Sequence, residues 1–293
     1  MTTVAAQAPR TLLDYLQRTT SFLAARGIDG ARLDAELLLA EVLGMTRTQL
    51  YTNFEQPLAA PEVGRYRDLV RRRAAREPVA YITGRREFWS LEFMVDRRVL
   101  VPRPETELVV EIAVDALRGC RGDAVRVADI GTGSGAIAVA VAKEVPRARV
   151  VATDRSGAAL EIAPANAERH GVADRIEFLA GDGCAPLVGK GAFDVVAANP
   201  PYIRSAEMGG LAPEVREWEP RWALEAGPDG MDVTTPLVEQ ALGVLAPGGW
   251  LIVEVGTQAS LVRDCFARCG YEGVAVRRDL AGIDRVVSGR RPA

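Results

Sequence analysis

Between residues 126 and 199 the chain repeats one pattern four times: a short apolar run that leads into a polar residue. Continuous apolar runs of this length are typical of strands buried on both faces of a parallel sheet. The polar residues at or near the strand ends are Asp129, Asp154, Asp182 and Asn199. In open α/β sheets, ligands bind where the strands end. We therefore expect an open α/β sheet with these four side chains grouped at one edge.

The last of these runs, Phe193–Ala198, is followed by Asn199-Pro200-Pro201-Tyr202. Neither proline has a backbone N–H, and each holds the residue before it extended, so the segment cannot relax into a helix. The Asn199 side-chain oxygen and the Pro200 carbonyl can then accept both hydrogens of a planar –NH2 group, with Tyr202 stacking on its face. The tetrapeptide predicts a receptor for an amide or an exocyclic base amine. A turn that only ends a strand is the competing interpretation.

A glycine-rich turn follows the first run and precedes an apolar helix, Ala136–Ala142. Glycines let the backbone approach a ligand closely. The Gly-x-Gly-x-Gly spacing, with Asp154 about twenty residues downstream to bind ribose hydroxyls, favours S-adenosylmethionine over a dinucleotide. Asp182 is placed to accept from an adenine amine. We predict a cofactor site formed by Gly131, Thr132, Gly133, Ser134, Gly135, Asp154, Asp182, Gly183 and Asn199.

Composition sets the outer limits. A chain of 293 residues with 48% hydrophobic residues suggests two domains, each with its own core. Residues 1–10 lack the pattern of a signal peptide, and the four cysteines form no framework, so we expect a short tail on a cytoplasmic protein. We also expect the protein to be a monomer. With His170 as the only histidine, neither a metal site nor triad catalysis is expected. A net charge of −3 argues against stable binding of nucleic acid.

Residues 1–77 predict a helical domain. Apolar residues recur at helical spacing from Leu12 to Leu23 and from Leu33 to Leu43, and a third helix is expected after Pro61. The third helix carries a basic run, Arg65–Arg76, which we interpret as a solvated face balanced by acids; contact with an RNA-bound or ribosome-bound partner is the alternative. With no catalytic constellation of its own, this domain is expected to dock the substrate.

Residues 78–100 are expected to form a linker with a β-hairpin over Glu87–Val95, and residues 101–293 a cofactor-binding catalytic domain. Paired prolines hold the loop Val101–Glu107 extended at the domain junction. Its carboxylates, Glu105 and Glu107, either cap the next helix or form a wall of the site.

Several motifs together resemble a known family. The glycine turn, Asp154, Asp182 and the Asn-Pro-Pro-Tyr tetrapeptide are similar to class I methyltransferases that modify planar nitrogens. Further motifs are similar to those of one family within this class, the bacterial release factor glutamine methyltransferases (the PrmC or HemK family), and the resemblance extends from about Leu12 to Val287. These motifs are Pro78–Gly84, Glu87-Phe88-Trp89, Val101–Glu107, Asp279–Gly282 and Asp284-Arg285.

The resemblance implies a seven-stranded, mostly parallel, doubly wound sheet with a small N-terminal helical domain. It also implies methyl transfer from S-adenosylmethionine to the amide nitrogen (N5) of the glutamine in the Gly-Gly-Gln motif of peptide chain release factors. The catalytic residues would be Asn199, Pro200, Pro201 and Tyr202, which together with Phe88, Arg103 and Glu105 would bind the substrate. Three positions depart from the family pattern: Gly183 replaces a frequent aromatic, Pro164 is expected to interrupt a helix, and Ile283 replaces a frequent arginine.

Two rival functions stay open. One is methylation of a different nitrogen, either a ribosomal protein glutamine or an adenine amine in nucleic acid, since the same tetrapeptide serves all of these. The other is a non-catalytic S-adenosylmethionine-binding scaffold, which would be expected to lose Asn199 or a proline.

Overall fold

The computed structural model describes residues 10–293, so the expected tail at residues 1–9 lies outside the described residues. The chain forms two compact units. The smaller unit comprises the chain up to Gly84 together with Pro213–Trp218, and the larger comprises Arg85–Ala212 and Glu219–Ala293. No helix among residues 10–293 is long and apolar enough to cross a membrane.

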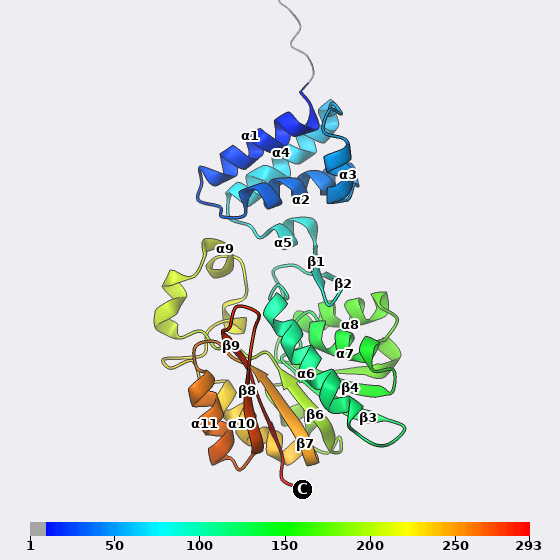
Figure 1. Ribbon diagram of the computed structural model, residues 1–293, viewed down its shortest axis with the longest axis vertical. Helices are drawn as coiled ribbons and strands as arrows, with labels where there is room; N and C mark the ends of the chain where they lie inside the picture. The colour runs from blue at the N-terminus through cyan, green and yellow to red at the C-terminus, as the bar shows by residue number, and fades with distance from the viewer. Residues whose placement is uncertain (1–9) are drawn as a thin grey trace, which may run out of the picture. The chain divides into compact units, whose positions relative to one another are not determined.

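The smaller unit is helical (Figure 1), as its apolar periodicity predicts. Its helices are α1 (Leu12–Ala24), α2 (Ala31–Leu43), α3 (Arg47–Thr52), α4 (Ala60–Ala74), α5 (Val79–Thr83) and α9 (Pro213–Arg216). A capping box at Thr11 and Asp14 begins α1, and Gly44, with φ of 63°, ends α2. The sequence did not predict the short helix α3, in which Leu50 alone is buried.

The basic run on α4 follows the preferred interpretation only in part. Arg71 pairs with Asp68, and Arg72 with Glu77, as expected of a face balanced by acids. For Arg73 that interpretation is wrong: it is 5% exposed and lies between two carboxylates. Its Nε is 2.6 Å from Asp34 Oδ2, and its Nη2 is 2.9 Å from Glu214 Oε1. Because both acids are distant in sequence, local periodicity could not identify this pair.

The larger unit opens with the predicted hairpin, confirmed as β1 (Arg85–Phe88) and β2 (Leu91–Met94). Trp89 and Ser90 form its turn with φ of 53° and 55°, the positive values that a tight hairpin turn requires. Residues 79–83, which precede it, form the short helix α5.

The predicted seven-stranded, mostly parallel sheet is confirmed (Figure 1), in the order β5-β4-β3-β6-β7-β9-β8. Only β9 is antiparallel, and it forms with β8 a hairpin at one edge of the sheet. The strands are β3 (Val125–Ile130), β4 (Ala148–Asp154), β5 (Ile176–Ala180), β6 (Phe193–Ala198), β7 (Leu245–Glu254), β8 (Glu272–Arg278) and β9 (Asp284–Arg290).

Helices cover both faces of this sheet, which makes it doubly wound. One face packs against α6 (Glu107–Arg118), α7 (Ala136–Glu144) and α8 (Ala159–Arg169), and the other against α10 (Thr234–Val244) and α11 (Ala259–Arg268). Alternate residues of the central strands, such as Val196 and Ala198, join the core beneath α10 and α11. Burial on both faces explains why these strands appear as continuous apolar runs rather than alternating ones.

Helix α8 corrects one expectation, because it continues through Pro164 rather than stopping there. The proline removes one backbone hydrogen bond. The fully buried Asn166 anchors the helix beyond that point. Its Oδ1 accepts from the Met94 N–H at 2.7 Å, and its Nδ2 donates to the carbonyls of Met94 and Ser134 at 3.0 and 2.8 Å. These tertiary contacts offset the lost hydrogen bond.

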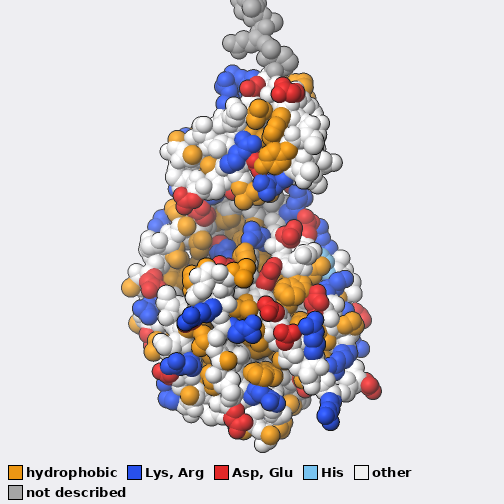
Figure 2. All heavy atoms as spheres, in the orientation of Figure 1, with side chains coloured by type: hydrophobic (Ala, Val, Ile, Leu, Met, Phe, Trp, Pro, Cys, Tyr) orange, Lys and Arg blue, Asp and Glu red, His pale blue; other side chains and the backbone are white. Residues whose placement is uncertain are grey.

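The chain order places the site. From β3 the chain passes outward through β4 and β5, then returns to the other side of β3 with β6 and β7. This reversal between β3 and β6 is the topological switch point, where the loops leaving the two strands diverge. The glycine turn leaves β3 and the Asn-Pro-Pro-Tyr tetrapeptide leaves β6, so the two motifs meet at the expected edge. On the face of the larger unit seen in Figure 2, basic and acidic side chains intermingle.

Candidate functional site

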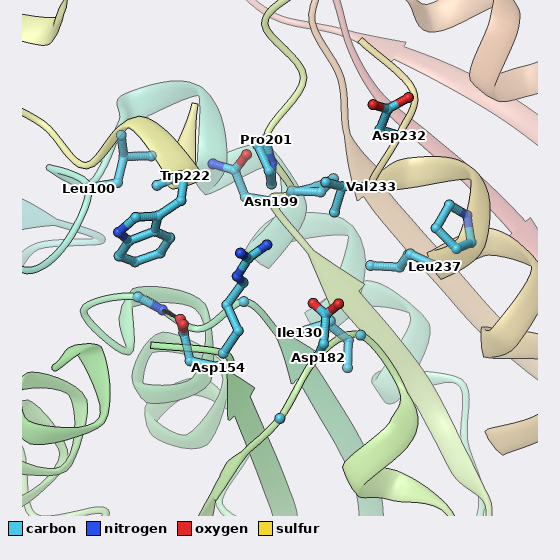
Figure 3. A pocket seen from close by; sticks show the side chains of 18 of the residues that line it. Leu100, Ile130, Asp154, Asp182, Asn199, Pro201, Trp222, Asp232, Val233 and Leu237 are labelled. Carbon is cyan, nitrogen blue, oxygen red and sulfur yellow. Dashed lines mark hydrogen bonds between the residues drawn. The ribbon is translucent and has the colours of Figure 1, made fainter. Parts of the chain in front are cut away.

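A cavity of about 290 Å³ lies at the carboxyl edge of the sheet. The glycine turn, the ends of β4 and β5, and the tetrapeptide all contribute to its wall. Figure 3 shows the side chains of Asp154, Asp182 and Asn199 around this space, with the Trp222 indole beside Leu100 and across from Asp182. The structure therefore brings together three of the four polar strand-end residues. The fourth, Asp129, is completely buried behind the turn and accepts from the Thr132 hydroxyl.

The glycine turn presents bare backbone to the cavity. Gly131 has a φ of 72°, and a Cβ added there would meet no atom within 4 Å, so it would project into open space. The turn is tied to β4, because the Gly131 and Thr132 N–H groups both donate to the Thr153 carbonyl, at 2.8 and 2.9 Å. Of the five predicted turn residues, Gly131 and Gly133 line the cavity.

The other turn residues serve the fold. Thr132 and Ser134 are buried. A Cβ on Gly135 would lie 3.2 Å from Ala163 Cβ, so this glycine permits close packing of the turn against α8.

Asp154 ends β4 and is 2% exposed. Its Oδ2 accepts from the Gly133 N–H at 2.9 Å and its Oδ1 from the Ser156 N–H at 2.8 Å. Burial raises the pKa of this carboxyl, while the two backbone N–H groups oppose the rise. Each oxygen retains a further lone pair, so the carboxylate can hold the turn and still accept from a pair of ligand hydroxyls.

Asp182 and Gly183 follow β5 and line the same cavity. A Cβ on Gly183 would lie 2.8 Å from Gln240 Oε1, so the carboxamide of Gln240 occupies the space into which a side chain at 183 would project. Gln240 is fixed there because its Oε1 accepts from the Cys184 N–H at 3.1 Å. Gln240, from α10, thus fills the space beside Gly183.

Asn199, Pro200 and Pro201 line the cavity. Asn199 Nδ2 donates to the Thr106 hydroxyl at 3.0 Å, which leaves its carboxamide oxygen available to a ligand. Tyr202 does not line the cavity. Its ring packs against Gly256, its hydroxyl donates to Glu254 Oε1 at 3.3 Å, and its carbonyl accepts from Gln258. The aromatic side chain in the wall is Trp222, which the sequence did not single out.

The three remaining predicted substrate residues lie outside the cavity wall. Phe88 is 2% exposed and packs edge-on against Phe93, with ring centroids 6.0 Å apart. Arg103 Nη2 pairs with Glu219 Oε1 at 2.7 Å. Glu105 is half-buried in the middle of the η1 turn (Pro104–Thr106) and acts electrostatically on Glu254 and Arg285.

Several wall residues have no sequence signal of their own. Trp222 and Ala223 belong to the irregular segment after the tetrapeptide. Leu100 immediately precedes the loop Val101–Glu107, and Arg155 immediately follows Asp154. A further group comes from α10 and the turn before it: Asp232, Val233, Pro236, Leu237 and Gln240. The length of the irregular segment suggested a functional loop, but no pattern indicated which side chains face the cavity.

Beneath the tetrapeptide lies a buried carboxyl group, Glu254, at the end of β7. It is 1% exposed, and burial raises its pKa to about 7, against the opposing hydrogen bonds from Thr106 and Tyr202. Glu105 also raises this pKa, and Arg285 lowers it. A glutamate in contact with water is ionised at neutral pH. At this buried position the protonated and ionised forms of Glu254 are closely balanced at neutral pH.

This balance predicts a pH-dependent difference in stability between the wild type and Glu254→Gln. The folded state binds the Glu254 proton more tightly than the unfolded state does, so its stabilising contribution is full below about pH 4.5 and is lost as the pH rises through about 7. Glutamine has no such proton. The unfolding free energy of Glu254→Gln should therefore rise relative to wild type by about 2–3 kcal/mol between these limits, at about 1.4 kcal/mol per pKa unit.

Denaturant unfolding of both proteins across this pH range measures the effect. Asp129, whose pKa burial also raises to about 7, is present in both proteins and cancels in the difference. Curves that stay parallel throughout would show that the Glu254 pKa is not raised.

Comparison with known proteins agrees with this geometry. Residues 14–84 match a family profile described as the PrmC N-terminal domain, and residues 108–212 match one described as Methyltransferase small domain. The chain is similar to a release factor glutamine methyltransferase of Geobacter sulfurreducens, with 47% identity covering 96% of each chain, and to one of Rhodopirellula baltica, with 43% identity covering 96% of each. A solved methyltransferase from Pyrococcus furiosus shares the fold, with a TM-score of 0.50 and 21% identity over 69% of this chain and 90% of its own.

Proposed function

We propose a function from one premise: this chain belongs to the release factor glutamine methyltransferase family. It transfers a methyl group from S-adenosylmethionine to the side-chain amide nitrogen of the glutamine in the Gly-Gly-Gln motif of a peptide chain release factor. The observation that carries the proposal is the position of Asn199, whose free carboxamide oxygen borders the same cavity as the glycine turn and Asp154. Such a substrate would place the activity in the cytoplasm, and a monomer remains our prediction.

The cavity wall suits the cofactor. The exposed backbone at Gly131 leaves room for a ligand where a Cβ would stand. Asp154 offers lone pairs to the ribose hydroxyls, and Asp182 can accept from the adenine amine. The apolar side chains of Ile130, Val233 and Leu237 supply the rest of an adenosine-sized site. S-adenosylmethionine, when bound, would supply an electrophilic methyl group on a positively charged sulfur; breaking the methyl–sulfur bond would leave a neutral thioether as the leaving group.

The amide nitrogen is a weak nucleophile, because its lone pair is delocalised into the carbonyl. Asn199 Oδ1 and the Pro200 carbonyl would hold its two hydrogens and orient the nitrogen for in-line attack. As the new N–C bond forms, positive charge develops on the nitrogen. The same two acceptors then bind more strongly than in the ground state, which lowers the barrier. One proton is subsequently lost from nitrogen to water, so no strong base is required.

Methyl transfer to a purified release factor tests the proposal. Incubation with methyl-labelled S-adenosylmethionine should label the factor, and a factor whose Gly-Gly-Gln glutamine is replaced by alanine is the matched control. DNA and ribosomal protein serve as competing acceptors. Label in either of these, with none in the factor, would replace the proposal with one of its rivals.

We further propose that the helical unit docks the release factor away from the glutamine. A groove between α1 and α4 is lined by Arg10, Tyr15, Arg18, Phe22, Tyr66, Arg67 and Arg71, among others. This concentration of arginines in a chain of net charge −3 favours an acidic partner surface. A deletion of residues 1–76 would be a poor test, because it removes Arg73 and Arg76, the ion-pair partners of Glu214.

Charge reversal in this groove is a cleaner test. Arg18→Glu with Arg67→Glu, both exposed side chains, should raise KM for the release factor by about tenfold, or about 1.4 kcal/mol. Cofactor affinity and kcat should not change. Arg263→Glu, on the exposed surface of α11, is the control for a general charge effect. An unaltered KM in the double variant would remove the docking role from this groove.

A further inference from the structure

The Asn199 carboxamide has two ends of nearly equal size and opposite hydrogen-bonding character. Only the oxygen can accept from an amide N–H, whereas the –NH2 end can only donate. With the carboxamide turned over, Asn199 would present donors to the donors of a substrate amide, and the receptor would fail. The side chain therefore needs a contact that distinguishes nitrogen from oxygen.

Thr106 and Glu254 form that contact. Asn199 Nδ2 donates to Thr106 Oγ1 at 3.0 Å, and Thr106 Oγ1 lies 2.6 Å from Glu254 Oε2. Thr106 and Glu254 are 4% and 1% exposed, so water does not compete for these hydrogen bonds. The three residues come from the turn before α6, the end of β6 and the end of β7.

The direction of these hydrogen bonds follows from counting hydrogens. A carboxylate only accepts, so the single hydrogen of the Thr106 hydroxyl must point to Glu254. The hydroxyl then has only lone pairs to offer Asn199, and only the nitrogen of the carboxamide can use them. Tyr202 supports the same arrangement by donating to the other carboxylate oxygen, Glu254 Oε1, at 3.3 Å. Above about pH 8, which exceeds the Glu254 pKa of about 7, the carboxylate form prevails.

We infer that Thr106 and Glu254 are positioning residues that fix the Asn199 carboxamide with its oxygen toward the substrate amide. This inference rests on the proposed function for its consequence in catalysis. The orientation itself is a property of the free protein and can be measured without substrate.

The kinetic test compares Thr106→Val, which keeps the shape and loses the hydroxyl, with Thr106→Ser, which keeps the hydroxyl. At about pH 8.5, Thr106→Val should lower kcat for release factor methylation by about 10- to 100-fold, since the acceptor is then misoriented for part of the time. Thr106→Ser should stay within about threefold of wild type, as should the cofactor affinity of both variants. Wild-type kcat in Thr106→Val, or an equal defect in both variants, would overturn the inference.

A double-variant cycle tests the role of Glu254. Glu254 reaches the Asn199 side chain through Thr106, and a glutamine at position 254 can still accept from the Tyr202 hydroxyl. Adding Glu254→Gln to Thr106→Val should therefore lower kcat no further. Independent, multiplying losses would show that Glu254 acts by another route.

A spectroscopic readout separates this inference from the proposed function. The side-chain 15N–1H resonances of Asn199 can be assigned by their disappearance in Asn199→Ala. They should be unchanged in Thr106→Ser and displaced in Thr106→Val, with faster exchange of the amide hydrogens with solvent. If the wild type failed to methylate release factor, these spectra would still decide the orientation. Unchanged resonances in Thr106→Val would overturn it even in an active enzyme.

Discussion

Asn199→Ala should lower the turnover of release factor methylation by about 10² to 10³, because loss of one preorganised hydrogen-bonding group at a reacting centre typically costs that much. The variant loses the acceptor for one amide hydrogen in a cavity whose wall is largely apolar. Cofactor affinity should fall far less, since the glycine turn, Asp154 and Asp182 are untouched. Single-turnover methylation and calorimetric titration of the cofactor on the same samples measure the two effects separately.

Asn199→Asp is the matched variant, because the carboxylate has nearly the same shape and retains an acceptor. It cannot donate to Thr106, whose hydrogen is already directed to Glu254, so two acceptors would face each other and a second negative charge would lie near Glu254. We expect partial activity, between wild type and Asn199→Ala. Wild-type turnover by Asn199→Ala would mean that the tetrapeptide only ends β6.

Asp154→Ala should weaken cofactor binding by about 5- to 150-fold, the equivalent of about 1–3 kcal/mol for a buried hydrogen-bonding group left without its partner. Two effects add here. The ribose hydroxyls lose their acceptor, and the Gly133 and Ser156 N–H groups lose theirs, so the glycine turn is less firmly held. Calorimetric titration with S-adenosylmethionine measures the loss directly.

Asp154→Asn separates the two contributions, because its oxygen can replace only one of the two carboxylate acceptors. Its affinity should lie between wild type and Asp154→Ala. Equal affinity in all three proteins would exclude Asp154 from the cofactor site.

The sequence was sufficient to predict strands and the residues at their ends wherever burial and local backbone chemistry favour the same structure. The apolar run Phe193–Ala198 could be assigned because a strand covered on both faces has no polar alternation, and the two prolines after it prevent a helix. The same reasoning located β3, β4 and β5 and put Asp154, Asp182 and Asn199 at one edge. The hairpin before Val95 could be predicted from its aromatic and alternating residues.

What the sequence could not provide depends on contacts between distant segments. Thr106 and Glu254 are 148 positions apart, and nothing near either one indicates the hydrogen bond between them. Trp222 reaches the cavity wall from an irregular segment, where no periodicity fixes the direction of a side chain. Pro164 was misjudged because the anchoring contacts of Asn166 come from β2 and the glycine turn. The Tyr202 side chain lies outside the cavity wall because its hydroxyl donates to Glu254 and its ring packs against Gly256.

The most direct test of the central claim is mass mapping of release factor peptides after incubation with S-adenosylmethionine and either wild type or Asn199→Ala. The account predicts one added methyl group in the wild-type reaction, located by fragmentation on the glutamine of the Gly-Gly-Gln peptide, and almost none with the variant over the same time. A methyl group on another residue, an unmodified factor beside methylated DNA or ribosomal protein, or equal modification by the two enzymes would contradict it.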